Sequence, residues 1–229
     1  MFSKIMNKAR LLARSFTHPA LPIRSLETIT GHIEKHFGSE FYVLDENVSS
    51  IVHIDVHVVH PTADRPFFTL LTSGMSDRDM QVPTGMEDLA LAEVCLCLPP
   101  SWPLGMNDSD WREAKHFWPI AALKEVAKYP HVHQTWFSWG HTIGSVERPE
   151  PIDSEGRFTG LILLNPATFP EGADELKADD GRTIRYLAVV PLLKEEMDFK
   201  HKNDTDALEE KLIESGVTEL LNPGRVSAV

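Results

Sequence analysis

The chain has 229 residues, of which 42% are hydrophobic and 24% are charged, and 34 acidic side chains against 22 basic ones give a formal net charge of −12. These proportions are typical of globular proteins and exclude collagen-like, low-complexity and broadly disordered classes. No apolar run approaches the roughly 18 residues of a membrane-spanning helix, and the acidic excess argues against nucleic acid as a partner, because lysine and arginine drive phosphate binding.

The first part of the chain predicts two helical segments. Residues 1–24 form a basic amphipathic segment, whose interpretation stays open between a helix that packs on the body and a targeting or membrane-surface helix. Residues 25–37 repeat apolar side chains every three to four positions, and Gly38 follows as a stop. We treat 25–229 as one domain.

Three strands are then predicted. Residues 48–60 alternate apolar and polar side chains, so one face of this strand is expected to point to the core and the other to solvent. Residues 67–72 and 89–98 read as two further strands, and Pro99-Pro100 ends the second of them.

The rest of the chain mixes helices with short strands. A helix over 110–129 is expected to be kinked or split at Pro119. The other expected elements, in order, are strands at 135–139, 142–146, 158–164 and 183–191, helices at 194–200 and 207–215, and a closing segment at 217–221. Runs of strands with a few helices between them predict an α+β fold, with helices covering a mixed, mostly antiparallel sheet.

The candidate metal ligands are His53, Asp55 and His57, which alternate on one strand face. Two imidazoles and a carboxylate could hold zinc or iron and give a metal-dependent hydrolase. Positions i and i+4 of a strand, however, lie about 13 Å apart, too far for one ion to bind both histidines easily. The alternative is that these three residues are only the polar face of an amphipathic strand.

Cys95 and Cys97 are the only cysteines, and on a strand they share one face. We interpret them as free thiols that pack as small hydrophobes. Reduced thiols and the absence of a secretory signal favour a cytoplasmic protein. Glu93 lies on the same strand face, either pointing to solvent or lining a cleft.

Four segments together resemble the suppressor of fused (SUFU) domain family. They are the strand pair 52–60 and 66–77 ending in Thr72-Ser73-Gly74-Met75-Ser76-Asp77, the strand Glu93-Val94-Cys95-Leu96-Cys97-Leu98 with Pro99-Pro100-Ser101-Trp102-Pro103, the motif Trp136-Phe137-Ser138-Trp139-Gly140-His141, and residues 191–199 with Leu220-Leu221.

The resemblance implies a binding domain without enzymatic activity or cofactor. Animal relatives carry a second domain and clamp a short strand-forming peptide of a zinc-finger transcription factor. Compact bacterial members, which this chain resembles in size, include proteins thought to be immunity proteins that neutralise polymorphic toxins. The resemblance therefore points to a protein partner, and binding of a short peptide by strand addition stays open beside it.

Five residues are the candidate partner-binding positions. Asp77 and Glu93 lie in the most family-like segments, and Phe67, Phe68 and Trp139 are candidate aromatic anchors. No residue is predicted to be catalytic.

The negative charge is concentrated in residues 150–229, which carry 17 acidic and 9 basic side chains. Two acidic stretches, Glu171–Asp180 and Glu195–Glu210, are expected to form one face that attracts a basic partner. A nuclease toxin fits this expectation, because its active face must be basic to hold phosphate.

Overall fold

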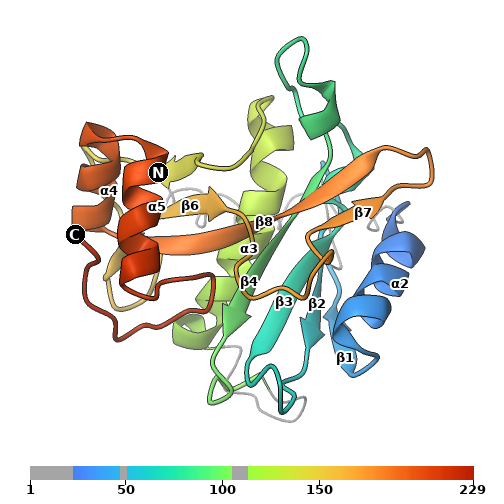
Figure 1. Ribbon diagram of the computed structural model, residues 1–229, viewed down its shortest axis with the longest axis horizontal. Helices are drawn as coiled ribbons and strands as arrows, with labels where there is room; N and C mark the ends of the chain where they lie inside the picture. Colours follow the sequence, from blue (N-terminus) through green and yellow to red (C-terminus); the bar gives the residue numbers. More distant parts are fainter. Residues whose placement is uncertain (1–22, 47–50, 105–112) are drawn as a thin grey trace.

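Figure 1 shows the computed structural model, which describes residues 23–46, 51–104 and 113–229. Within these ranges eight strands form one sheet in the order β1-β2-β3-β4-β8-β6-β5, and β7 also pairs with β8. The pair β4–β8 is parallel, whereas the other strand pairs are antiparallel. The strands are β1 (Phe41–Leu44), β2 (Asp55–Val59), β3 (Phe68–Ser73), β4 (Ala92–Leu98), β5 (Thr142–Gly144), β6 (Phe158–Leu164), β7 (Glu175–Lys177) and β8 (Thr183–Leu193). The α+β class with a mixed, mostly antiparallel sheet is confirmed.

Four helices accompany the sheet in the part of the chain that the structure describes. They are α2 (Leu26–Phe37), α3 (Ala114–His133), α4 (Lys194–Lys202) and α5 (Thr205–Glu214). None of the helices in these ranges has the length and apolar character needed to cross a membrane.

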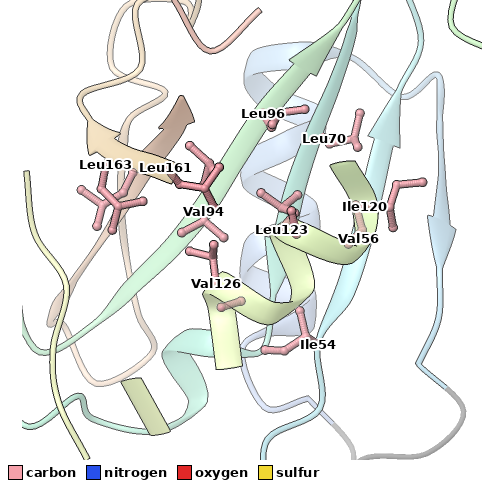
Figure 2. Close-up of a cluster of buried hydrophobic side chains, with 14 of the residues drawn as sticks. Ile54, Val56, Leu70, Val94, Leu96, Ile120, Leu123, Val126, Leu161 and Leu163 are labelled. Atoms are coloured by element: carbon pink, nitrogen blue, oxygen red, sulfur yellow. The ribbon is translucent and has the colours of Figure 1, made fainter. Parts of the chain in front are cut away.

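One face of the sheet packs against α3. Side chains from β2, β3, β4 and β6 meet the buried side chains of this helix, and Figure 2 shows the cluster they form. Its labelled members are Ile54, Val56, Leu70, Val94, Leu96, Ile120, Leu123, Val126, Leu161 and Leu163. All ten are fully buried. Val94 and Leu96, and Leu161 and Leu163, are each two residues apart on a strand, as are Ile54 and Val56 where β2 begins, so each pair shares one face, and the apolar half of the predicted alternation faces α3.

On the opposite face, α2 covers one part of the sheet and the α4–α5 pair covers another. The long strand β8 extends under both. Its outward side chains Ile184, Tyr186 and Ala188 pack in the cluster under α2, whereas Val190 and Leu192 pack under α4 and α5. β8 pairs with β4 over Arg185–Ala188 and with β6 over Ala188–Leu193. The strand beside β8 therefore changes at its middle.

Some predicted elements differ from the structure. The helix expected over 110–129 is one continuous helix from Ala114 to His133, with Pro119 and Pro130 inside it, and its expected start lies outside the described residues. The buried side chains that follow Pro119 hold this helix on the sheet, and this packing offsets the hydrogen bond that the proline removes. Residues 135–139 form no strand, and the expected strand over 48–60 is reduced to β2, while residues 47–50 are not among those described.

The two acidic stretches do not form one face. Glu171–Asp180 lies around β7, next to α2, whereas Glu195–Glu210 lies on α4 and α5. Figure 1, drawn with the longest axis horizontal, places these regions at opposite ends of the molecule. The expectation of a single acidic face is therefore wrong, because the order of strands in the sheet separates segments that are near in sequence.

Candidate functional site

The turn that follows β3 is the centre of the most family-like region. Gly74 has a φ of 104°, and a Cβ at this position would lie 1.9 Å from the carbonyl oxygen of His53. Only glycine fits, since it has no Cβ and adopts positive φ without strain. The short 3-10 helix Met75–Asp77 then turns the chain back toward β4.

The Glu93 carboxylate lies under this turn and holds it to β4. Its Oε1 accepts hydrogen bonds from Gly74 N at 3.0 Å, Ser76 N at 2.9 Å and Ser76 Oγ at 2.7 Å, and its Oε2 accepts one from Thr72 Oγ1 at 2.6 Å. The side chain is fully buried. Four donors therefore satisfy one carboxylate, and no lysine or arginine is among them.

Burial raises the pKa of Glu93 above its ordinary value, because a charged carboxylate loses its hydration in the interior. The hydrogen bonds from Thr72 and Ser76 act in the opposite direction, and the nearby charge of Asp77 adds to the rise. Removing water is the larger effect.

Asp77, at the end of the same turn, fixes the start of α2. Its Oδ1 accepts hydrogen bonds from Ser25 N at 2.9 Å and Ser25 Oγ at 2.6 Å, and its Oδ2 accepts one from Arg24 N at 2.5 Å. A carboxylate at this position also interacts favourably with the positive end of the helix dipole. Asp77 thereby ties α2 to β3 over about 50 residues of sequence.

The structure thus brings Asp77 and Glu93 together, but as a junction between β3, β4 and α2. The expectation that Glu93 points to solvent or lines a cleft is wrong, because the side chain is 0% exposed. A buried carboxylate held by four donors offers a partner no charge. Asp77 is half-buried, and its oxygens are already occupied by backbone and hydroxyl donors.

The three aromatic candidates lie elsewhere. Phe68 begins β3, at the opposite end of that strand from the junction, and is 7% exposed in the core under α3, while the neighbouring Phe67 is half-buried. Trp139 is half-buried against α5, where its Nε1 donates to Glu209 Oε1 at 3.2 Å. The five candidates therefore do not form one site.

The polar positions of β2 face the interior instead of solvent. His57 is fully buried, with its Nε2 3.0 Å from Ser73 Oγ, and Asp55 is 5% exposed, with its Oδ1 2.8 Å from His53 Nε2. The prediction of a solvent-facing strand was wrong because α2 covers this face of the sheet. In the described ranges no three His, Cys, Asp or Glu side chains are grouped closely enough to hold a metal ion.

Both cysteines are buried free thiols, as the sequence predicts. Burial raises the pKa of Cys97 to about 12 and that of Cys95 well above its ordinary value. We expect neither thiol to react with Ellman's reagent at pH 8 in the folded protein, since only the thiolate is nucleophilic. In denaturant both thiols should react; fast reaction of one thiol in the folded state would contradict this burial.

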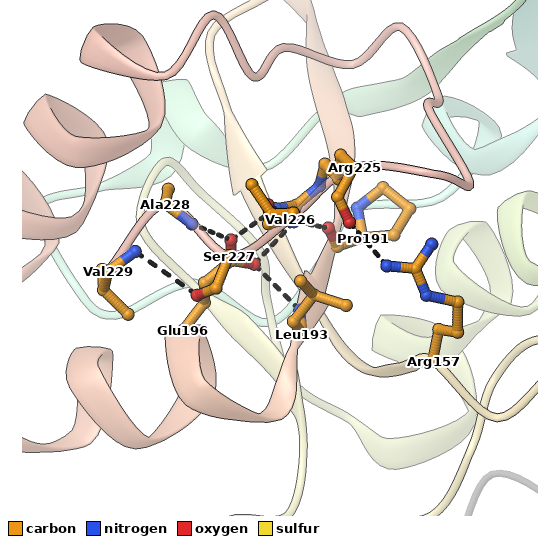
Figure 3. Close-up of polar contacts among 9 residues, drawn as sticks. All are labelled: Arg157, Pro191, Leu193, Glu196, Arg225, Val226, Ser227, Ala228 and Val229. Carbon is orange, nitrogen blue, oxygen red and sulfur yellow. Dashed lines mark hydrogen bonds and ion pairs between the residues drawn. The ribbon is translucent and has the colours of Figure 1, made fainter.

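The sequence patterns did not predict one buried ion pair. Glu196, expected within a solvated acidic run, is fully buried, and both of its oxygens bind the guanidinium of Arg225. Figure 3 shows that the same carboxylate also receives Leu193 N at 2.8 Å and Ala228 N at 3.0 Å, while Arg225 donates to Pro191 O at 2.9 Å. The one local signal was a glutamate three residues after the last strand residue, where a glutamate can bond back to the backbone at a helix start.

Comparison with known proteins identifies the chain. The family model for Suppressor of fused protein (SUFU) matches residues 51–226, which include β2 to β8, with Asp77 and Glu93 of the junction, and most of the C-terminal tail. The chain belongs to the suppressor of fused family. No curated protein matches it.

Solved structures of the suppressor of fused family share this fold. A SUFU homologue from Neisseria gonorrhoeae FA 1090 is 18% identical and superposes with a TM-score of 0.61 over 89% of this chain and 96% of that chain. A chain of the Sufu–Fu complex is 11% identical, with a TM-score of 0.63 over 91% and 93% of the two chains. Drosophila Suppressor of fused is 12% identical with a TM-score of 0.62, and the match covers 90% of this chain but 52% of that one.

Proposed function

We propose that this protein is a non-enzymatic, cytoplasmic binding domain that neutralises a basic protein toxin. The proposal rests on family membership combined with a net charge of −12. A related fold occurs in the Sufu–Fu complex, so this architecture is used to bind another protein. An acidic surface speeds association with a basic partner and disfavours acidic ones.

The surface of α5 is the part of the molecule best suited to such a partner. Asp206, Glu210 and Glu214 recur every four residues, so they lie along one side of the helix, and all three are exposed. We call these three residues the α5 acidic stripe. Leu208 and Leu212 are buried on the opposite side and hold the helix in place.

An aromatic side chain lies beside this stripe. Trp139 is bonded to Glu209 on α5 and is half-buried, so its position is fixed by packing while part of the ring stays accessible. A fixed tryptophan next to charged residues is typical of the anchors that dominate binding energy in interfaces. Trp139 is the one of the five candidate residues that joins an acidic surface in this structure.

The test is capture and growth rescue. The wild-type protein is used to capture polypeptides from its host at low and high salt, and a captured basic polypeptide is then expressed alone and with this protein. The polypeptide alone should arrest growth, and co-expression should restore it. The triple variant Asp206→Asn, Glu210→Gln, Glu214→Gln should slow association about tenfold or more and weaken the rescue.

A variant of equal charge change is the control. Glu171→Gln, Asp174→Asn, Glu175→Gln removes three charges at the other end of the molecule and should leave association near the wild-type rate. A captured polypeptide that is harmless when expressed alone, or equal loss of binding in both triple variants, would contradict the proposal.

A further inference from the structure

A groove of about 330 Å³ lies between α2 and β7, at the opposite end of the molecule from the α5 acidic stripe. His32, Lys35 and His36 line it from α2, and Glu175 and Lys177 line it from β7. Two histidines therefore share a recess that no contact described above uses.

His32 and His36 are one helical turn apart, so they project from the same side of α2. Their ring centroids are 4.5 Å apart, with the ring planes inclined by 41°. Two imidazoles this close can bind the same ion, since a zinc–nitrogen bond is about 2.0–2.1 Å long.

Two contacts orient the ring of His32. Its Nε2 lies 3.0 Å from the carbonyl oxygen of Ala173. A carbonyl only accepts, so Nε2 is the donor in this contact, and Nδ1 is the ring nitrogen left for another partner. Metal-binding histidines commonly donate their other N–H in this way, which orients the ring and raises its basicity. The ring also stacks on Tyr186, with centroids 6.3 Å apart, which restricts its rotation.

We propose that His32 and His36 bind one divalent transition-metal ion of the kind that prefers imidazole, such as Cu²⁺, Ni²⁺ or Zn²⁺. In the described part of the chain no third His, Cys, Asp or Glu completes the set. Glu175, on the facing strand, is engaged by Arg185 Nε at 2.9 Å. Water therefore fills the other coordination positions, and the ion exchanges readily.

The charges around the groove limit its affinity and provide a test. Lys35 and Lys177 line the same recess and repel a cation, although Lys177 Nζ is bound to Thr183 Oγ1 at 2.7 Å. Lys35 is exposed, so replacing it by glutamine removes charge with little effect on packing. Lys35→Gln should therefore tighten metal binding, which a merely structural role for the histidines would not produce.

The experiment is titration of untagged protein with Cu²⁺ and with Zn²⁺ by calorimetry, with circular dichroism to verify that each variant is folded. One ion should bind, and His32→Ala and His36→Ala should each weaken binding more than about tenfold. The copper-bound protein should show two nitrogen ligands by electron paramagnetic resonance.

His201→Ala is the matched control, because His201 is an exposed histidine in the last turn of α4. It should bind the ion as the wild type does. Wild-type affinity in both α2 variants, or equal weakening in all three histidine variants, would overturn the proposed site. Unchanged or weaker binding by Lys35→Gln would also count against it.

Discussion

Replacing Glu93 by alanine is expected to lower the free energy of unfolding by about 4 kcal/mol. The variant leaves the backbone N–H groups of Gly74 and Ser76 buried without their acceptor. The two hydroxyl donors lose less: Thr72 Oγ1 already lies 3.2 Å from Val94 O, and Ser76 Oγ lies 3.4 Å from Ser25 Oγ. The loss therefore comes from the backbone of the turn.

Glu93→Gln is the matched control and should stay within about 1 kcal/mol of the wild type. Its amide oxygen can accept from the same turn, and its amide nitrogen can donate to Thr72 Oγ1, which then gives its own proton to Val94 O. Urea denaturation at neutral pH measures both differences. A Glu93→Ala variant as stable as Glu93→Gln would show that the junction contributes little.

The difference in stability between the wild type and Glu93→Gln, measured against pH, reports the protonation of Glu93. Its pKa in the folded state lies above the ordinary value of 4.5, so folding favours the protonated form. The wild type should gain stability relative to Glu93→Gln as the pH falls through the raised pKa, with the full gain below about pH 4.5. The gain disappears as the pH rises through the raised pKa. A constant difference between the two proteins across this range would contradict the shift.

Replacing Arg225 by alanine is the second large expected effect, a loss of about 3–5 kcal/mol. The Arg225 side chain is 9% exposed, and its guanidinium binds both oxygens of the fully buried Glu196, so the variant leaves a buried carboxylate without its counter-charge. Arg225 also lies over the ring of Phe158, 5.7 Å from its centroid, and this contact is lost too.

The location of this loss is testable. Ala228 N–H donates to Glu196, so its hydrogen exchange should accelerate in Arg225→Ala if the ion pair holds the C-terminal tail. In the double variant Arg225→Ala, Glu196→Gln the two losses should not add, because neutral glutamine needs no counter-charge. Arg182→Ala is the control: its partners Asp79 and Asp180 are exposed, so its removal should change stability much less. Equal effects at Arg182 and Arg225 would contradict a special role for burial.

Local sequence patterns predicted the elements well where burial and periodicity agree. Residues 25–37, 158–164 and 183–191 match α2, β6 and most of β8. Cys95 and Cys97 were correctly interpreted as buried thiols, because an apolar run ended by two prolines describes a buried strand. The family resemblance, carried by short motifs spread over the chain, is confirmed by the family match.

Failures occurred where a polar residue has its partner far away in sequence. Glu93 is satisfied by a turn 17 to 21 residues earlier, and Glu196 by an arginine 29 residues later. The alternation predicted that His57 faces solvent, yet it is fully buried on the face of the sheet against which α2 packs. Whether a carboxylate or an imidazole is exposed depends on the layer placed over it, and alternation within one strand does not reveal a second layer.

The sequence by itself determined the fold class, the family and the acidic balance, because these depend on composition, periodicity and short motifs. The tertiary structure alone decided where the acidic charge lies. The first half of β8 pairs with β4 and the second half with β6. As a result, α2 and β7 lie at one end of the sheet, and α4 and α5 lie at the other. The two acidic stretches therefore act from two separate surfaces, and the one on α5 adjoins the half-buried Trp139.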